Sequence, residues 1–289
     1  MKEDAHMYGA ILGDMIGAPY EFDQGDKTKD FELFNKRKWV RYMDDTAMTV
    51  AIAKAIMTAG LNANEIAMKR EFVKAMRDIG NRYAQGEYGG RFLEWLHSSY
   101  PQPYGSWGNG SAMRVSSIRW FFDSLERTRE VARWSAEVTH NHPEGIKGAE
   151  SVAAAIYMFR NGKSKEEVKH FIEDEFGYDL SRTCDEIRPT YHHVESCQGT
   201  VPEAIIAFLE STDFEDAIRN AVSLGGDCDT LTCITSGLAE AFYGVPDDLK
   251  QECISRLPDE FLGVIDKFYV ICHRRFMGCG EQDVFFKRR

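Results

Sequence analysis

Glycines at every fourth position near the start of the chain constrain its fold more than any other feature. Gly9, Gly13 and Gly17 lie in an apolar stretch at residues 8–20, YGAILGDMIGAPY, that Pro19 should bring to an end. Residues spaced by four share one face of a helix. Each glycine costs a helix about 1 kcal/mol relative to alanine. The stripe therefore predicts that the backbone of another element packs closely against this face.

Helical periodicity continues along most of the chain and determines the predicted fold class. No segment shows the period-two alternation of β-branched residues that is typical of strands. The helical patterns run over residues 44–60, 64–80, 129–137, 146–159, 165–176, 200–211 (with Pro202 in the first turn), 213–223, 246–256 and 258–274. No linker rich in proline or serine divides them. We therefore predict an all-α fold, a globular orthogonal bundle of many helices, with residues 1–289 in a single domain.

Charge and cysteine content narrow the classes of function. The chain has 46 acidic and 35 basic residues, a net charge of -11, which argues against a general binder of nucleic acid or anionic membranes. Seven cysteines occur without the CxxC spacing of zinc sites. With no signal peptide and no apolar run long enough to cross a bilayer, the expected location is the reducing cytoplasm.

Two aspartates stand at the start of a predicted helix late in the chain. Residues 223–244 read SLGGDCDTLTCITSGLAEAFYG, so Asp227, Asp229 and Thr230 follow two glycines. They precede a run of small and apolar residues with helical spacing. Two carboxylates and a hydroxyl are therefore expected together at the mouth of this helix.

A second acidic corner occurs far earlier in the chain. Asp44, Asp45 and Thr46 lead into a helical stripe that Gly60 closes. An aspartate at a helix start accepts hydrogen bonds from backbone N–H groups that lack partners within the helix. Capping of this kind explains one of the two aspartates but not both.

The two acidic corners together suggest a metal centre. Buried carboxylates without partners are strongly disfavoured, and clustering raises the pKa of at least one of them. A divalent cation removes both penalties, and ligands that are all oxygen favour Mg²⁺ or Mn²⁺, with Ca²⁺ as an alternative, over zinc. Two pairs of carboxylates suggest two ions that orient a substrate and activate water. The competing interpretation is four unrelated surface aspartates.

A polar, glycine-rich loop at residues 105–111, GSWGNGS, is expected to open onto a helix. Backbone N–H groups of such a loop and of a helix N-terminus bind anions, although a plain turn is the simpler interpretation. His140 and His142 lie two residues apart and are metal ligands in principle. We expect a capping or substrate-contacting role for His140 instead.

The segment that follows the first helix is unusually long for a connection in a compact fold. Residues 23–42 are polar and irregular, and loops of this length are usually functional or disordered. Phe31, Phe34 and Trp39 are expected to anchor the segment. Glu21, just before it, is a surface carboxylate on the evidence of this stretch alone.

Five blocks of sequence, taken in order, resemble the ADP-ribosylglycohydrolase family. The blocks are GAILGDMIGAPYEF, MDDTAM, GSWGNGSAMR, THNHPEGIKGA and SLGGDCDT, and the resemblance runs from about Gly9 to Gly244. The family includes the ADP-ribosyl-acceptor hydrolases and the dinitrogenase reductase-activating glycohydrolases. The resemblance implies an all-α fold with two Mg²⁺ or Mn²⁺ ions, and hydrolysis of the bond between the distal ribose of ADP-ribose and its acceptor.

The resemblance also implies roles for individual residues. The residues that match metal ligands are Asp44, Asp45, Asp227, Asp229 and Thr230. The residues that match the loop holding the diphosphate are Gly105, Ser106, Trp107, Gly108 and Asn109. Glu21 matches a flexible-loop glutamate near the metals, His140 matches a histidine on the distal ribose side, and residues 23–42 match a mobile active-site loop. These matches favour the functional interpretation of Glu21 and of the glycine-rich loop.

One residue departs from the family pattern. The family usually has Thr-Asp-Asp-Thr at the first corner, where the first threonine is a metal ligand, and this chain has Met43 there. A thioether is a poor ligand for hard Mg²⁺, so one metal site is expected to be weakened, filled by water or lost. Cys228 replaces a common threonine, which is tolerable because alternate positions need not face the metals.

The resemblance implies a hydrolytic mechanism. The ions bind the hydroxyls of the distal ribose and orient a water molecule toward the anomeric carbon. Glu21 or a ligand carboxylate, Asp44 or Asp45, takes the proton as the C–N or C–O bond breaks. The expected substrate is an ADP-ribosylated protein, with an arginine-linked acceptor favoured, or a small molecule that contains ADP-ribose.

Two other classes of function stay open. A degenerate family member would bind ADP-ribose, or a partner such as an ADP-ribosyltransferase, without hydrolysis; Met43 favours this hypothesis, whereas Glu21 and the intact aspartates oppose it. An HD-type metal phosphohydrolase requires adjacent His-Asp ligands, and no His-Asp dipeptide occurs in the chain.

Overall fold

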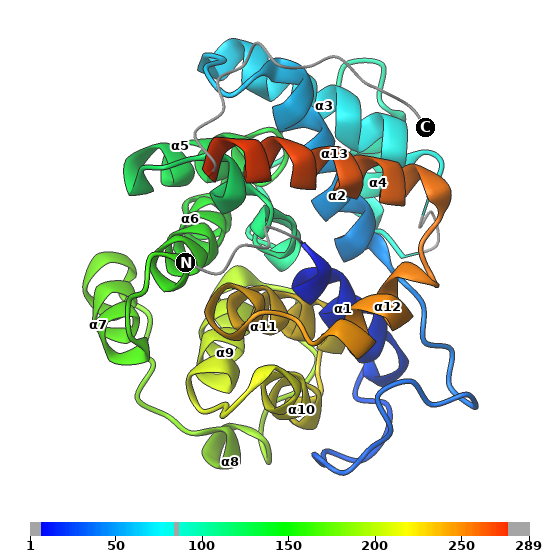
Figure 1. The fold of residues 1–289 in the computed structure, drawn as a ribbon, viewed down its shortest axis with the longest axis vertical. Helices are drawn as coiled ribbons and strands as arrows, with labels where there is room; N and C mark the ends of the chain where they lie inside the picture. Colours follow the sequence, from blue (N-terminus) through cyan, green and yellow to red (C-terminus); the bar gives the residue numbers. More distant parts are fainter. Residues whose placement is uncertain (1–6, 84–86, 277–289) are drawn as a thin grey trace.

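Two helices that are far apart in the sequence, α1 (Tyr8–Gly17) and α11 (Cys228–Tyr243), pack along each other in the interior of the molecule (Figure 1). The computed structural model describes residues 7–83 and 87–276. Added Cβ atoms at Gly9, Gly13 and Gly17 would lie 2.6 Å from Glu240 Cβ, 2.5 Å from the Thr232 carbonyl carbon and 2.7 Å from Asp229 Cα. Real Cβ atoms do not approach other atoms so closely, so the predicted backbone contact is confirmed and α11 supplies it.

The described residues form helices and connecting loops, and apart from one isolated bridge between Gly108 and Ser196 they contain no β-structure. The other α-helices are α2 (Asp44–Ala59), α3 (Glu65–Gly80), α4 (Gly90–His97), α5 (Leu125–Glu137), α6 (Pro143–Arg160), α7 (Lys165–Phe176), α8 (Cys184–Ile187), α9 (Cys197–Leu209), α10 (Phe214–Leu224), α12 (Asp247–Ile254) and α13 (Asp259–Phe276). Short 3₁₀ turns are η1 (Ala18–Tyr20), η2 (Asn109–Ser111), η3 (Met113–Val115) and η4 (Ile118–Phe121). The predicted all-α class is confirmed, and the single domain stays a prediction.

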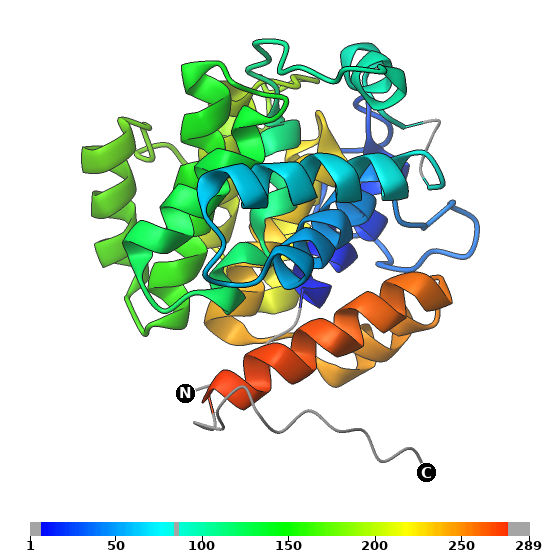
Figure 2. The same cartoon turned by 90° about the horizontal axis from the view of Figure 1, so that it is seen from above.

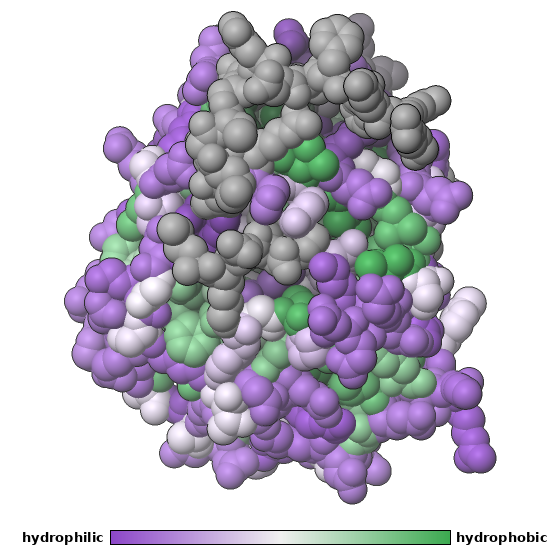
Figure 3. Space-filling view, viewed as in Figure 1, coloured by the Kyte–Doolittle hydropathy of each residue, from purple (hydrophilic) through white to green (hydrophobic). Residues whose placement is uncertain are grey.

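The remaining helices surround the central pair on several sides. Helices α9 and α10 pack against α11, α2 packs beside α1, and α3 covers α2 (Figure 1). Helix α13 crosses α2 and lies along one edge of the molecule (Figure 2). Figure 3 shows that polar side chains cover most of the described surface on one face. None of the described helices has the length and apolar content needed to cross a membrane.

Several local predictions from the sequence differ from the structure. Helices α4 and α8 were not predicted, and α5 begins at Leu125 rather than at residue 129. Helix α9 begins at Cys197 rather than residue 200, so Pro202 lies inside the helix, in its second turn. The glycine-rich loop opens onto successive 3₁₀ turns rather than an α-helix, so no helix N-terminus adds to its anion affinity. Trp39, an expected anchor, is 78% exposed, whereas Phe31 and Phe34 pack against the core as expected.

The N-terminus of α1 is capped by a carboxylate from the far end of α11. The side chain of Glu240 is 5% exposed, and its Oε2 accepts a hydrogen bond of 3.1 Å from the Gly9 backbone N–H. Its Oε1 is buried and has no hydrogen-bond partner within residues 7–83 and 87–276. Burial raises the pKa of Glu240 from 4.5 to about 8. The start of α1 is therefore tied to the last turns of α11 by an acid whose burial is unfavourable when it is ionised.

Alanine at position 13 tests the backbone contact. We expect Gly13→Ala to lower the free energy of unfolding by at least about 3 kcal/mol, or to prevent folding, because its Cβ would overlap the Thr232 carbonyl group. The matched control is Gly263→Ala in α13, where an added Cβ meets nothing within 4 Å and helix propensity should add up to about 1 kcal/mol. Urea denaturation followed by circular dichroism measures both. Equal stability of the two variants would contradict the close contact.

The buried acid at position 240 predicts a pH dependence of stability. Because the folded-state pKa of Glu240 exceeds its ordinary value, the unfolded chain loses this proton first, and stability falls as pH rises from about 4.5 to about 8. We expect Glu240→Gln to make the dependence of the free energy of unfolding on pH less steep, by up to about 1.4 kcal/mol per pH unit, which corresponds to one proton. Denaturation curves between pH 4.5 and 8 measure it, with the exposed Glu94→Gln as the control for loss of one charge. A slope unchanged by Glu240→Gln would refute the prediction.

Candidate metal centre and substrate site

Carboxylates from three helices converge where α1, α2 and α11 meet. One oxygen each of Asp14, Asp45 and Asp229 lies within 4.8 Å of the other two. All three side chains are at most 3% exposed. Each helix contributes one carboxylate, so the cluster depends on the packing of all three helices.

A second group of carboxylates adjoins the first and shares one member with it. One oxygen each of Glu21, Asp227 and Asp229 lies within 4.8 Å of the others. Glu21 follows η1 and is partly exposed, and Asp227 is the N-cap residue of α11. The structure thus brings Glu21, Asp45, Asp227 and Asp229 together, as the sequence analysis expected. Asp44 belongs to neither group, although its pKa is raised by burial and by the charges of Asp14 and Asp227.

Asp14 completes the first group, and the sequence analysis gave it no role. Its Oδ2 accepts hydrogen bonds from the backbone N–H groups of Met43, at 2.8 Å, and Thr46, at 3.2 Å, and from the Thr46 hydroxyl. Asp14 therefore caps the N-terminus of α2 from another helix. The signal that could have identified it is a lone acid within an apolar helix, because a buried charge requires partners.

Burial and mutual repulsion raise the pKa values of the clustered acids. Burial raises the pKa of Asp14 to about 7, and burial together with the charge of Asp227 raises the pKa of Glu21 to about 7. Burial and neighbouring aspartates hold the pKa values of Asp45 and Asp229 well above their usual range. The site therefore has a strong electrostatic preference for a cation.

Two buried oxygens in this centre have no hydrogen-bond partner among the described residues. They are Asp14 Oδ1 and Asp45 Oδ1. The nearby Thr230 hydroxyl lies 3.4 Å from Asp45 Oδ2. Unpaired, buried carboxylate oxygens beside a hydroxyl are suitable ligands for a hard divalent cation such as Mg²⁺ or Mn²⁺. The residues present thus fit the predicted metal, and Met43, which is 5% exposed, offers no oxygen from its side chain.

The glycine-rich loop lies against the Asp227 side of the centre. Gly105 adopts a positive φ of 67°, and its N–H donates to Asn141 Oδ1 at 2.7 Å. The Gly108 N–H donates to Ser106 Oγ at 3.0 Å. Trp107 is half-exposed and contacts His142 edge to face. The loop is held in shape by side chains while its outer surface stays accessible.

Asn109 links this loop directly to the carboxylates. It is 6% exposed, and its Nδ2 donates to Asp227 Oδ2 at 2.6 Å and to Thr200 Oγ1 at 3.0 Å. Asn109 therefore orients a carboxylate of the centre, a contact that the sequence analysis did not anticipate when it grouped Asn109 with the diphosphate-binding loop.

His140 lies beneath the loop and is buried. Its Nδ1 lies 2.7 Å from Thr139 Oγ1, and its Nε2 points to the loop, 3.2 Å from where a Cβ on Gly110 would stand. Burial, together with the nearby Arg114, holds the pKa of His140 well below its usual range. Arg114 is itself 1% exposed and donates to Thr139 Oγ1 at 2.9 Å. A neutral imidazole thus lies against the loop, and Thr139 Oγ1 links it to the buried Arg114.

A further histidine, missed because its spacing gives no signal, lies at the mouth of the site. His193 Nε2 lies 3.1 Å from Glu195 Oε1, and its ring contacts Phe22 with centroids 4.6 Å apart. Phe22 and Asp23 both adopt φ of 57°, which is strained for residues other than glycine. Asp23 accepts hydrogen bonds from the His193 and Gly226 N–H groups at 3.1 and 2.9 Å. The turn after Glu21 is therefore fastened to the Asp227 corner.

Comparison with known proteins gives one consistent family. The profile described as ADP-ribosylglycohydrolase matches residues 5–279. The chain is 28% identical to ADP-ribosylhydrolase ARH3 of Bos taurus, over 85% of this chain and 86% of that protein. It is 24% identical to ADP-ribosyl-[dinitrogen reductase] glycohydrolase of Rhodospirillum rubrum, over 86% and 87%. It is 26% identical to ADP-ribosylarginine hydrolase Tri1 of Serratia proteamaculans, over 90% and 78%.

A solved structure has the same fold. The protein titled ADP-ribosylglycohydrolase-related protein complex superposes with a TM-score of 0.65, covering 96% of this chain and 99% of that chain at 19% identity. The family match spans nearly all of the sequence, and carboxylates from three of the sequence blocks (Asp14 and Glu21, Asp45, and Asp227 and Asp229) meet in two adjoining groups. The chain therefore belongs to the ADP-ribosylglycohydrolase family.

Proposed function

We propose that this protein is a hydrolase, dependent on Mg²⁺ or Mn²⁺, that cleaves the bond between ADP-ribose and an acceptor residue of a protein. The observation that carries the proposal is the convergence of Glu21, Asp14, Asp45, Asp227 and Asp229, with unpaired buried oxygens, beside a glycine-rich loop. Carboxylates that repel one another in a buried site are retained where a bound cation compensates for them.

The carboxylates have separable roles in this proposal. Asp45, Asp227, Asp229 and Thr230, with Asp44 at the edge of the centre, would hold the metal, which would supply Lewis-acid polarisation of water and of the distal ribose hydroxyls. Through Oδ2, Asp14 fixes the first turn of α2 on which Asp44 and Asp45 stand, and its unpaired Oδ1 would be available to the metal.

Glu21 is the candidate for proton transfer. It lies at the open side of the second group, and the pKa of about 7, raised by burial and by Asp227, matches the requirements of a general base or acid near neutral pH. The Asp23 contacts to Gly226 and His193 keep Glu21 close to the Asp227 corner.

The loop at residues 105–109 is proposed to bind the diphosphate. The Gly105, Gly108 and Asn109 N–H groups already donate within the protein, so the N–H groups of Ser106 and Trp107 are the ones proposed to donate to the anion. His140, kept neutral by burial, is suited to hydrogen bonding with ribose rather than to ion pairing. Binding of these remote groups would orient the anomeric carbon at the carboxylate centre.

The activity can be tested with ADP-ribosylated protein. We expect release of ADP-ribose in the presence of Mg²⁺, measured by chromatography, and its loss in Asp229→Ala, because Asp229 belongs to both carboxylate groups. Met43→Thr should equal or exceed the native rate, because it supplies a hydroxyl at the first corner. No release at high enzyme concentration, from the native chain or from Met43→Thr, would disprove the hydrolase proposal.

Metal dependence has a readout that is independent of activity. We expect Mg²⁺ at about 100 times its Kd to raise the free energy of unfolding by about 2.7 kcal/mol. Asp45→Asn should remove this effect, and without metal the variant should be more stable than the native chain at pH 7.5, because it removes an acid whose pKa burial and neighbouring aspartates raise above its unfolded value. Calorimetry measures both, with Glu94→Gln as the control. Equal Mg²⁺ stabilisation of native protein and Asp45→Asn would contradict the assignment.

A second candidate function, binding of ADP-ribose without hydrolysis, is favoured by Met43 alone. Its thioether occupies the position of a hydroxyl ligand, and a centre that lacks one ligand could still bind the nucleotide. Calorimetric binding of ADP-ribose by a native chain that shows no turnover on any ADP-ribosylated acceptor would support this candidate over the hydrolase.

A further inference from the structure

A cluster of positive charge stands out in an acidic chain. Four of the six residues at positions 36–41, KRKWVR, are lysine or arginine, whereas the whole chain carries a net charge of -11. Lys36, Arg37 and Trp39 are exposed, and Lys38 and Arg41 are partly buried. The segment interleaves cations with an aromatic residue, and it belongs to the long connection at residues 23–42 that follows Glu21.

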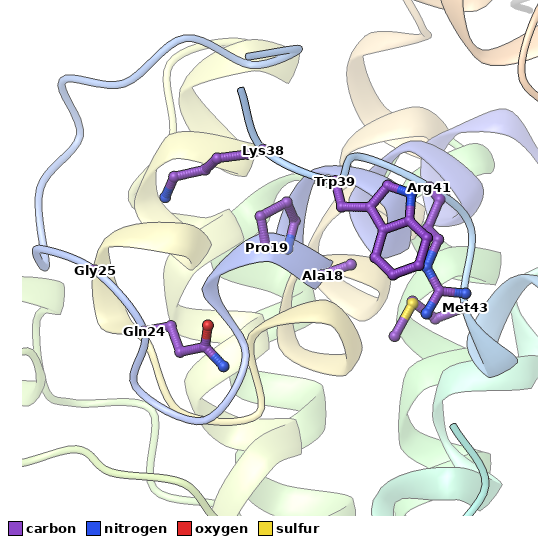
Figure 4. Close-up of a pocket in the computed structure, with 8 residues that line it drawn as sticks. All are labelled: Ala18, Pro19, Gln24, Gly25, Lys38, Trp39, Arg41 and Met43. Carbon is purple, nitrogen blue, oxygen red and sulfur yellow. The ribbon is translucent and has the colours of Figure 1, made fainter. Parts of the chain in front are cut away.

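The cationic segment forms one wall of a pocket. The pocket has a volume of about 460 Å³, and its lining includes Pro19, Gln24, Lys38, Trp39, Arg41 and Met43. Figure 4 shows Trp39 and Arg41 side by side near Met43, with Lys38 on the other side of Pro19. A cavity of this size is large enough for one or two amino-acid side chains.

Two residues that line this pocket, Pro19 and Met43, adjoin residues of the carboxylate centre in the chain. Met43 immediately precedes Asp44, and Pro19 belongs to the turn that leads into Glu21. The loop at residues 105–109, by contrast, contacts the centre through Asp227. A substrate with its diphosphate at the loop and its distal ribose at the carboxylates would direct its acceptor toward the pocket.

The cations of the pocket are held in defined positions. The Arg41 guanidinium lies 4.5 Å from the centroid of the Trp39 ring and forms an ion pair with Glu87, and Lys38 Nζ lies 3.6 Å from the centroid of Tyr20. The ion pair with Glu87 uses only some of the five N–H donors of the Arg41 guanidinium. The pocket therefore presents directed positive charge to an acceptor.

We infer that the pocket formed by Lys38, Trp39 and Arg41 selects an O-linked ADP-ribosyl residue in an acidic protein segment. This inference rests on the proposed function. An ADP-ribosylated arginine keeps a positive guanidinium, which Lys38 and Arg41 would repel, whereas a hydroxyl acceptor is neutral. Carboxylates beside the modified residue would pair with the two cations. The arginine-linked acceptor expected from the sequence is thus disfavoured by the charge of the pocket.

A protein segment suits the pocket better than a nucleic acid does. Trp39 could stack on a base, but the net charge of -11 opposes the long-range approach of a polyanion. One face of Trp39 already lies against Arg41. An acidic protein segment carries only a few carboxylates near the modified residue, and the cations of the pocket are sufficient to pair with them.

The test compares ADP-ribosylserine peptides that differ only in flanking residues. With glutamate flanks we expect a kcat/KM about fivefold higher than with glutamine flanks at low salt, because two exposed ion pairs contribute about 0.5 kcal/mol each. Lysine flanks should lower kcat/KM below the glutamine value. The preference should appear in KM and shrink as salt rises. ADP-ribosylarginine in the glutamate frame should be a poorer substrate than ADP-ribosylserine in that frame.

Substitutions in the pocket provide the decisive comparison. In Lys38→Gln/Arg41→Gln the ratio between glutamate and glutamine flanks should fall to about one, and Lys74→Gln, an exposed lysine of α3, should keep the native ratio. A native ratio near one, a ratio unchanged in the double variant, or preferred turnover of an ADP-ribosylated oligonucleotide end would overturn the inference. If no peptide is turned over, the hydrolase proposal fails separately, and the Kd values of the same peptides, measured by fluorescence anisotropy, test the charge preference.

Discussion

The contact between the backbones of α1 and α11 is the constraint on which the candidate site depends. A side chain at Gly17 would overlap Asp229, so only glycine allows α1 to approach the first turn of α11. The same contact sets the register of the two helices. A shift by one helical turn would move Asp14 about 5.4 Å along the helix axis, which exceeds the 4.8 Å within which its oxygen meets those of Asp45 and Asp229. Packing of small residues thus determines which carboxylates meet.

The site concentrates negative charge where helix N-termini can partly compensate for it. Asp44 and Asp45 lie in the first turn of α2, and Asp227 and Asp229 lie at the start of α11. Helix dipoles favour acids there, and Asp14 adds a cap to α2 from outside the helix. These interactions leave the pKa values of the acids raised. The apolar packing around the central helices must therefore stabilise a centre that is electrostatically unfavourable without a cation.

Features that depend on residue type and on spacing along the chain could be predicted from the sequence. Most of the helices, the glycine contact and the two acidic corners follow from spacing and residue type, and the structure brings Asp45, Asp227 and Asp229 together. The short helices α4 and α8 carry too little periodic pattern to be predicted. Features that depend on tertiary contacts were not predictable. Asn109 contacts Asp227 across more than 100 residues of sequence. Trp39 looks like an anchor by composition, yet the irregular segment leaves it exposed.

The backbone and the side chain of Met43 act in different parts of the site. Its backbone N–H donates to Asp14, so the start of α2 is held regardless of the side chain. Its side chain lines the pocket beside Trp39 and Arg41. In the proposed centre, the loss of one hydroxyl ligand therefore leaves the carboxylates in position, because Asp14 and the α1–α11 contact hold them. The thioether would add apolar surface where the proposed acceptor enters, and the missing hydroxyl would weaken ligation of the proposed metal.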